Sequence, residues 1–412
     1  MASTCSRTPA ATFLLLPLLL ISLSSSHQAD AGCRFKAIFN FGDSNSDTGG
    51  FWAAFPAQNG PYGITFFHRH SGRASDGRVF IDFLAQALGL PFLSPYLRSI
   101  GSDFQHGANF ATAASTVLMP NTSVFVSGIS PFYLSVQFNQ MKDFRDRLLG
   151  VCSIQNTALH LRSRTTLMER GRVEGRKIGR TEGNLPPPDI IGQAVYTLDI
   201  GQNDFTSDLA IIGIEGVKQY LPQVAYQIGR TIEELYDIGG RTFLVFNLAP
   251  IGCFPAFLKE LPHSNSDLDE YGCMVSYNKA VVDYNNLLNQ TLQEIRDQLS
   301  DASVIYVDTH SVKLELYQHP KTHGFSYSTR ACCGHGGGDY NFDPGLFCGN
   351  TKEINGCFVT ANACPDPENY VSWDGIHATE AANKLLTMAI LNGSYFYPPF
   401  PLFELCELKP IG

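Results

Sequence analysis

Short apolar segments alternate along this chain with longer segments whose apolar residues recur every three or four positions. The short segments have the length and composition of buried strands, and they cover residues 36–41, 194–198, 242–248 and 303–307. The longer segments have the spacing of amphipathic helices, and they cover residues 77–88, 217–238, 271–299 and 378–391. This alternation predicts a parallel sheet covered by helices on both faces, and therefore the α/β fold class.

Polar residues follow two of the predicted strands, at the carboxyl ends of the strands, where parallel sheets bind ligands and place catalytic residues. Ser44 comes shortly after the segment 36–41, and Asn203 follows the segment 194–198. A serine at a strand-to-helix turn presents its hydroxyl outward, and a side-chain amide can donate to a developing oxyanion. The alternative interpretations are a helix N-cap for Ser44 and a polar turn for Asn203.

An aspartate and a histidine stand three residues apart near the carboxyl end, as Asp374 and His377. A serine hydroxyl is a poor nucleophile until an imidazole takes its proton, and a carboxylate orients that imidazole. An Asp and a His at this spacing, entering a helix, can meet across one turn. The pair by itself is a weak signal, because a lone histidine is more often structural.

The residues 106–109 include Gly107, whose backbone N–H is a second candidate donor to an oxyanion; a glycine-dependent turn is the alternative. The chain has no G-x-S-x-G, P-loop, G-x-G-x-x-G or H-E-x-x-H motif. We interpret the sequence His-Gly-Gly-Gly at 335–338 as a flexible loop, because it lies far downstream of any candidate serine. His68 and His70 lack accompanying ligands, so we predict no metal and no cofactor.

The first 31 residues have the pattern of a signal peptide. An apolar run covers residues 13–23, and Ala-Asp-Ala at 29–31 fits a small-residue cleavage site. The run is shorter than the ~20 apolar residues that a membrane span needs. We therefore predict one domain over residues 32–412, released into the secretory pathway, with the cell wall and the Golgi lumen as the compartments in question.

Cysteines agree with export, since five of the 11 crowd a region rich in Gly, Asn and Pro. They are Cys332, Cys333, Cys348, Cys357 and Cys364. In an oxidising compartment such a cluster predicts disulfides that constrain a long loop, and the spacing lacks the paired C-x-x-C units of a zinc site. Their pairing is left open. Three sequons, at Asn121, Asn289 and Asn392, are candidate glycosylation sites.

The formal net charge of −9 gives the protein no electrostatic reason to bind nucleic acid or an anionic membrane. Residues 153–183 differ from the acidic chain as a whole, because the segment is rich in arginine. It also carries no strand or clear helical signal. It is an atypical basic insert after a helix-like segment that ends near Leu149. A solvated loop, translated intron sequence and a basic ligand-binding arm are the three interpretations.

Four motifs in this order resemble the plant GDSL esterase/lipase family of the SGNH hydrolases. They are FNFGDSNSDTGG at 39–50, GANFA at 107–111, GQND at 201–204 and WDGIH at 373–377. The resemblance runs from about residue 35 to the carboxyl terminus, apart from the basic insert.

The resemblance implies a three-layer α/β/α sandwich with a central parallel sheet, of the SGNH or flavodoxin-like type, and metal-free acyl transfer. It assigns the nucleophile to Ser44, the general base to His377 and the residue that orients the base to Asp374. It assigns the oxyanion hole to the backbone N–H groups of Ser44 and Gly107 and the Asn203 side chain.

The substrate that the resemblance favours is an O-acetyl ester of cell-wall polysaccharide, with lipid acyl esters as the alternative. The aromatic residues Tyr62, Phe66 and Phe67 are candidates to stack on sugar rings, to line an acyl groove or simply to pack. A protein that binds glycans without turnover is the rival of a different class. It would lose nothing when Ser44 is replaced by alanine.

Overall fold

A six-stranded sheet with the strand order β10-β5-β4-β3-β1-β2 forms the centre of the protein. The computed structural model describes residues 33–120, 129–165 and 184–412. The strands of this sheet are β1 Ala37–Gly42, β2 Gly107–Asn109, β3 Ala194–Asp199, β4 Thr242–Phe246, β5 Ser303–Val307 and β10 Phe396–Tyr397. All neighbouring strands pair in parallel except β10, which pairs antiparallel with β5 at one edge.

Successive side chains of these strands enter two separate hydrophobic cores. In β1, for example, Phe39 and Phe41 belong to one core and Ile38 to the other, and Val195 and Tyr196 of β3 divide in the same way. This alternation follows from the two-residue period of a strand, and burial on both faces explains why the strands are almost entirely apolar.

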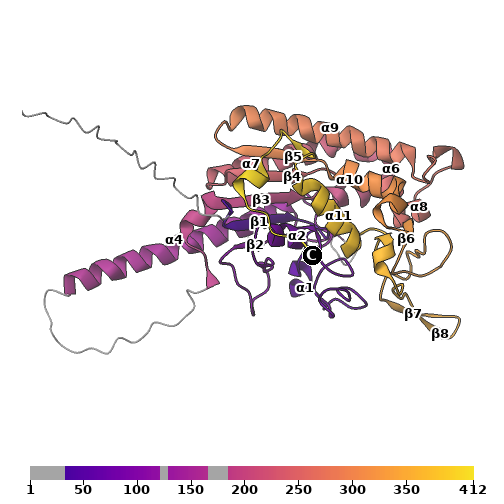
Figure 1. Ribbon diagram of the computed structural model, residues 1–412, viewed down its shortest axis with the longest axis horizontal. Helices are drawn as coiled ribbons and strands as arrows, with labels where there is room; N and C mark the ends of the chain where they lie inside the picture. The colour runs from indigo at the N-terminus through magenta and orange to yellow at the C-terminus, as the bar shows by residue number, and fades with distance from the viewer. Residues whose placement is uncertain (1–32, 121–128, 166–183) are drawn as a thin grey trace, which may run out of the picture. The chain divides into compact units, whose positions relative to one another are not determined.

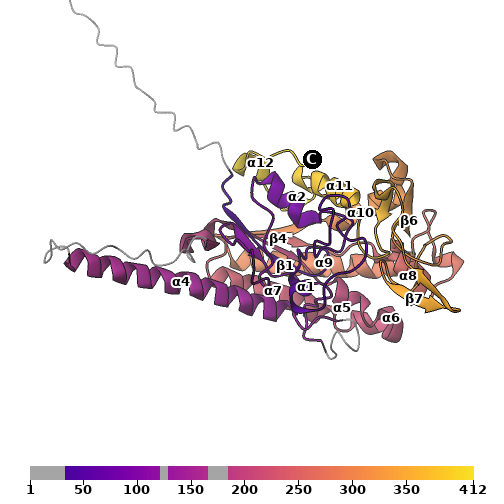
Figure 2. The ribbon, with the colours of Figure 1, turned by 90° about the horizontal axis from the view of Figure 1, so that it is seen from below.

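Helices cover both faces of the sheet, which Figure 2 shows between its two helical layers. The first core is closed by helices α4 Leu134–Thr165, α7 Leu221–Asp237 and α9 Val275–Gln298. The second core is closed by helices α2 Phe80–Ala87, α10 Thr309–Gln318, α11 Glu380–Leu391 and α12 Leu402–Leu405. The predicted three-layer α/β/α sandwich is confirmed, with the antiparallel β10 as an added edge strand.

Shorter elements complete the chain (Figure 1). The remaining helices are α1 Gly50–Ala54, α5 Gln202–Thr206, α6 Leu209–Lys218 and α8 Pro255–Glu260. A second sheet pairs β6 Tyr327–Ala331 with β9 Tyr370–Ser372, and a hairpin pairs β7 Thr351–Ile354 with β8 Cys357–Thr360. Residues Cys33–Gly412 form one compact unit, and the predicted signal peptide lies outside the described residues.

Within the described residues, disulfides join Cys33 to Cys406, Cys253 to Cys273, Cys332 to Cys364 and Cys333 to Cys348. The cysteine-rich segment is therefore bridged as expected, except that Cys357 is exposed at the start of β8 and unbridged.

The basic segment differs in part from the expectation. Helix α4 continues to Thr165, so the prediction of no helical structure after residue 153 is wrong for residues 153–165. No proline interrupts this stretch, and its Leu, Arg, Gln and Ala residues have good helix propensity. The rest of the segment, 166–183, lies outside the described residues.

Candidate active site

The turn after β1 holds Ser44 at the carboxyl-terminal edge of the sheet. Asn109, at the end of the neighbouring β2, fixes this turn through four hydrogen bonds. Its Nδ2 donates to Ser46 O (2.7 Å) and Thr48 Oγ1 (2.9 Å), and its Oδ1 accepts from Asn40 Nδ2 (2.7 Å) and the Ala111 amide (3.0 Å). Every contact is buried, so the turn cannot change its shape without leaving polar groups unsatisfied.

Asp47 connects the same turn to the chain beyond β2. Its carboxylate accepts hydrogen bonds from the amides of Gly49, Gly50 and Phe51 at the start of α1. It also accepts from the Ala113 amide at 2.8 Å. The start of α1 and the segment that begins at Ala113 are therefore held together by one buried side chain.

The turn between β9 and α11 holds Asp374 and His377, which precede the helix rather than lying on it. Asp374 Oδ1 accepts from the amides of Ile376 (3.0 Å) and His377 (2.9 Å), which makes the turn compact. Gly375 has a φ of +99°, and a Cβ at this position would lie 2.6 Å from the Phe342 ring. Glycine is therefore required between the two residues for both backbone shape and space.

Ser44, His377 and Asp374 lie in hydrogen-bonded sequence. Ser44 Oγ is 2.7 Å from His377 Nε2, and His377 Nδ1 is 2.7 Å from Asp374 Oδ2. Burial disfavours the charged imidazole, but the charge of Asp374 and its hydrogen bond outweigh burial and raise the pKa of His377 above 6.5. Ser44 is only 7% exposed, and it lines a cleft.

Asn203, at the start of α5, lies at the same edge. Its Nδ2 donates to Ser115 O at 2.8 Å and to Asp43 Oδ2 at 3.4 Å. The next residue, Asp204, accepts from the amides of Val117 (2.7 Å) and Leu118 (3.0 Å). Burial raises the pKa of Asp204 to about 7. Together these side chains hold the segment that follows Ala113 against the end of β3.

The structure does not bring Gly107 to this edge, which corrects the sequence-based assignment. Gly107 pairs with Ile38 near the start of β1, whereas Ser44 follows the end of that strand. The Gly107 amide donates to Phe104 O at 3.1 Å and is occupied. The glycine is required there because a Cβ would lie 1.9 Å from Ile38 O. The motif around Gly107 contributes instead through Asn109.

Ala114 is a backbone donor that sequence reasoning missed. It lines the same cleft as Ser44 and Asn203, and its amide donates no hydrogen bond within the described residues. Its φ of +61° is left-handed, a conformation that costs a non-glycine residue about 1–2 kcal/mol. An alanine in the sequence carries no signal of this conformation.

A cleft of about 610 Å³ opens over these residues, within the size range of ligand sites. Its aromatic lining includes Phe51, Trp52 and Phe55 from α1 and its carboxyl end. The polar residues Gln58 and Asn350 also line it, although the Gln58 amide is bound to backbone groups of Gly72 and Arg73.

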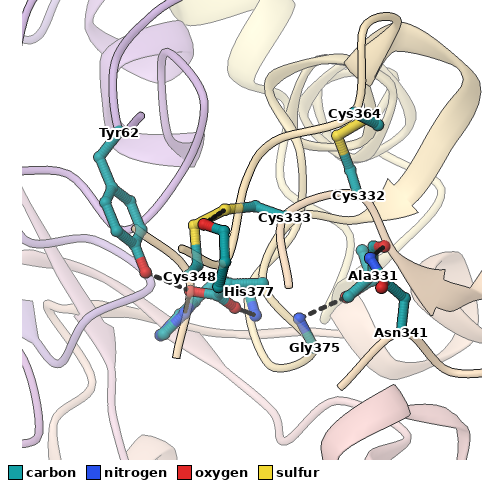
Figure 3. The surroundings of a disulfide bond; sticks show 12 residues. Tyr62, Ala331, Cys332, Cys333, Asn341, Cys348, Cys364, Gly375 and His377 are labelled. Atoms are coloured by element: carbon teal, nitrogen blue, oxygen red, sulfur yellow. Dashed lines mark hydrogen bonds and ion pairs between the residues drawn. A yellow bond between two sulfur atoms is a disulfide. The ribbon is translucent and has the colours of Figure 1, made fainter. Parts of the chain in front are cut away.

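The cysteine-rich segment forms part of the same cleft. Phe347 and Cys348 line it, and Figure 3 shows the Cys333–Cys348 disulfide beside His377. Tyr62 also lines the cleft, which agrees with two of the three roles that the sequence left open for it.

The GDSL-like Lipase/Acylhydrolase family model matches residues 38–390 of the chain. The chain belongs to this family. It is 58% identical over 396 residues to GDSL esterase/lipase At4g01130 of Arabidopsis thaliana, covering 96% of this chain and 97% of the relative. It is 42% identical to Alpha-L-fucosidase 3 of Arabidopsis thaliana (93% and 97% covered) and 40% identical to Esterase of Hevea brasiliensis (96% and 95% covered). As a GDSL family member, the protein is a carboxylic ester hydrolase.

Other candidate residues of this GDSL hydrolase lie away from the cleft or outside the described residues. Phe66 and Phe67 pack against each other and Phe92, and Arg78 and Arg73 lie over their rings. These two aromatic residues therefore have a packing role and do not line the cleft.

The glycosylation candidates differ in their exposure. Asn392 is exposed at the end of α11, Asn289 is half-buried on α9, and Asn121 lies outside the described residues. Among the residues described, no three His, Cys, Asp or Glu side chains form a group that could hold a metal ion. No helix in the same ranges has both the length and the apolar character to cross a membrane.

Proposed function

We propose that this GDSL hydrolase is a secreted serine esterase in which Ser44 is the nucleophile, His377 the general base and Asp374 the residue that orients His377. The observation that carries the proposal is the series of two 2.7 Å contacts from Ser44 through His377 to Asp374, at the base of a substrate-sized cleft.

Acyl transfer then runs in two halves. The Ser44 hydroxyl gives its proton to His377 Nε2 while Oγ attacks the ester carbonyl carbon, and the carbonyl oxygen takes up the negative charge. Collapse of this intermediate releases the alcohol, which receives the proton from His377. Water attacks the acyl-enzyme by the same route, gives a proton to His377, and the acid leaves as Ser44 regains its proton.

The oxyanion is stabilised in this proposal by the backbone N–H groups of Ser44 and Ala114 and by the Asn203 amide. Ala114 takes the place that the sequence gave to Gly107. Two observations support it: the Ala114 amide donates to no acceptor among the described residues, and the Asn203 amide donates to the carbonyl of Ser115, the residue that follows Ala114. Donors fixed in this way need little reorganisation when charge develops.

The proposed substrate is an O-acetyl ester of a cell-wall polysaccharide. Aromatic rings of Phe51, Trp52 and Tyr62 beside the polar Asn350 suit a sugar, whose faces stack and whose hydroxyls hydrogen-bond. The volume of the cleft far exceeds an acetyl group, which leaves room for the alcohol part of the ester. A lipid acyl ester is the competing substrate class for the same aromatic lining.

Secretion is part of the proposal. It is supported by the signal-like pattern of residues 1–31 and by four disulfides within the described residues, which persist in oxidising compartments. The cell wall is the proposed destination, with the Golgi lumen as the alternative.

The test compares the secreted wild type with Ser44→Ala on nitrophenyl esters from acetyl to long acyl chains, and on acetylated polysaccharide with release of acetate as the readout. We expect activity greatest on acetyl and lost in Ser44→Ala. A long-chain optimum would favour lipid substrates, and equal rates in both proteins would contradict the mechanism. Nitrophenyl fucoside is included because one relative is named a fucosidase; hydrolysis that survives in Ser44→Ala would indicate a separate chemistry.

A further inference from the structure

The hydroxyl of Tyr62 donates a hydrogen bond to Asp374 Oδ2 at 3.1 Å, across 312 positions of sequence. Oδ2 is the same oxygen that lies 2.7 Å from His377 Nδ1. Figure 3 shows Tyr62 pointing at this position, next to His377. Tyr62 therefore contacts the one atom through which Asp374 acts on the base.

The two oxygens of Asp374 have different partners. Oδ1 accepts from two backbone amides of its own turn, so the turn holds that oxygen without help. Oδ2 accepts from His377 and Tyr62 alone among the described residues. Because the Tyr62 donor withdraws charge from Oδ2, it reduces how strongly Asp374 stabilises a protonated His377.

The loop that carries Tyr62 is anchored to the cysteine-rich segment by a close backbone crossing. A Cβ on Gly60 would lie 2.5 Å from Gly349 Cα, and a Cβ on Gly349 would lie 2.4 Å from Gly60 Cα. Gly349 follows Cys348, whose disulfide partner Cys333 donates its amide to Trp373 O at 2.6 Å.

Trp373 connects the Cys333–Cys348 disulfide with Asp374 and Tyr62. It is fully buried, precedes Asp374 directly, and its ring centroid lies 6.0 Å from that of Tyr62. The Tyr62 loop, the disulfide and the catalytic turn thus support one another in a closed series of contacts.

We propose that Tyr62 is a positioning residue of the esterase, which acts through Asp374 to fix Oδ2 and to moderate its pull on the proton of His377. The proposal rests on the catalytic roles proposed for Ser44, His377 and Asp374. Burial and Asp374 raise the pKa of Tyr62 above its ordinary value, so the hydroxyl remains a donor at all working pH values.

Other charged and titratable groups surround the same site, and they are unchanged by a substitution at Tyr62. Asp374, Asp43 and Lys313 face His377, while Tyr317 faces Asp374 and Asp199 faces Asp43. A shift in the pKa of His377 on loss of the Tyr62 hydroxyl is therefore measured with all other groups around the site unchanged.

The test is Tyr62→Phe, which removes the hydroxyl and keeps the ring that lines the cleft. We expect the acid limb of the kcat/KM profile to move upward by about 0.5 to 1 pH unit, because His377 becomes easier to protonate. We expect kcat to fall by about 3- to 10-fold, since a mobile Oδ2 orients the imidazole less well, with KM within about twofold.

The matched control is Tyr196→Phe, which removes another buried hydroxyl, bound to Ile191 O at 3.0 Å in the middle of the first core. This variant is expected to change stability but not the position of the acid limb. An unmoved acid limb in Tyr62→Phe, or a rise in KM with kcat unchanged, would overturn the proposal.

A second measurement needs no turnover. In the Ser44→Ala protein, the imidazole of His377 is titrated by NMR with Tyr62 present and with Tyr62→Phe added. A higher His377 pKa in the double variant supports the proposal, and an equal value refutes it. Full esterase activity in Ser44→Ala alone would instead remove the proposed function, so the two failures are distinguishable.

Discussion

Ser44 lies at the edge of the six-stranded sheet, whereas Asp374 and His377 follow a strand of a separate two-stranded sheet. The region around Ser44 is held by buried side chains such as Asn109 and Asp47, which hydrogen-bond to backbone groups of the turn. The region around His377 has bonds of the same kind, for example from the Gly375 amide to Ser372 Oγ and from the His377 amide to Asp374 Oδ1. It differs in having two disulfides as well, in the segment before β9, at Cys332–Cys364 and Cys333–Cys348.

The difference separates two ways to fix a catalytic group. The proposed nucleophile lies in a turn held by hydrogen bonds between side chains such as Asn109 and Asp47 and backbone groups. The proposed base follows a segment whose buried residues Tyr370 and Trp373 pack with Cys332, Cys333 and Cys348 in a small separate cluster, where covalent links add to the apolar contacts. Reduction is therefore expected to affect the second region more than the first.

After Ser44→Ala, the largest effect on activity is expected in the first region, at Asn203. In the proposed mechanism Asn203→Ala removes an oxyanion donor, so kcat is expected to fall by about 10²–10³-fold. The fold is expected to survive, because Asp204 still holds the amides of Val117 and Leu118. Circular dichroism and steady-state kinetics check both parts. Activity equal to wild type would remove Asn203 from the mechanism.

Removal of one disulfide tests the second region directly. The double variant Cys333→Ser/Cys348→Ser is expected to lose roughly 10-fold in kcat, because Gly349 and the Tyr62 loop lose their anchor beside His377. The loop that it closes spans 15 residues, for which the stability cost is about 3 kcal/mol.

The control for this prediction is Cys33→Ser/Cys406→Ser, which opens a link of sequence separation 373 far from the cleft. It is expected to cost at least as much stability but little activity at temperatures where the protein stays folded. Equal activity losses in the two double variants would contradict a specific role for the disulfide next to His377.

Acidification is expected to stabilise the first region. Burial raises the pKa of Asp204 to about 7 and that of Asp47 to about 6, and burial with Asp199 raises the pKa of Asp43 to about 7. In the unfolded chain these groups lose their protons near pH 4, so between about pH 4 and 7 the folded state binds more protons. The free energy of unfolding then falls as pH rises, by ~1.4 kcal/mol per pH unit for each group still protonated.

His377 acts in the same direction. Its raised pKa contributes stability that is full below pH 6.5 and lost as pH rises through the folded value. Thermal unfolding at constant ionic strength checks the sum: the midpoint should be higher at pH 5 than at pH 7. A midpoint that is higher at pH 7 than at pH 5 would show that these carboxyl groups are ionised in the folded protein.

Periodicity in the sequence predicted most of the sheet, because strands buried on both faces are continuous apolar segments. It missed β2 and β10, which have three and two residues and are too short to show a period. The motifs correctly marked the segments of Ser44, Asn203, Asp374 and His377, and their catalytic roles stay predictions.

Sequence reasoning failed where tertiary geometry decides. Gly107 lies in the expected motif, but the strand register places it by Ile38, and Asn109 is the residue of that motif that reaches the Ser44 turn. Tyr62 meets Asp374 only through the fold, since no local pattern connects residues so far apart in sequence. Ala114 was missed because backbone conformation, not side-chain type, makes its amide a donor.

The smallest expected effect concerns the backbone donor at Ala114. Ala114→Gly keeps the backbone N–H and relieves a left-handed φ of +61°, so kcat should stay within about twofold of wild type. The relief of about 1–2 kcal/mol is partly offset by the greater freedom of glycine in the unfolded chain, which leaves a net gain of ~0.5 kcal/mol. Denaturant unfolding and steady-state kinetics measure the two quantities. A loss of stability would mean that the packing of the alanine methyl group outweighs the strain. A large loss of kcat would mean that rigidity at this position, rather than the donor alone, supports catalysis.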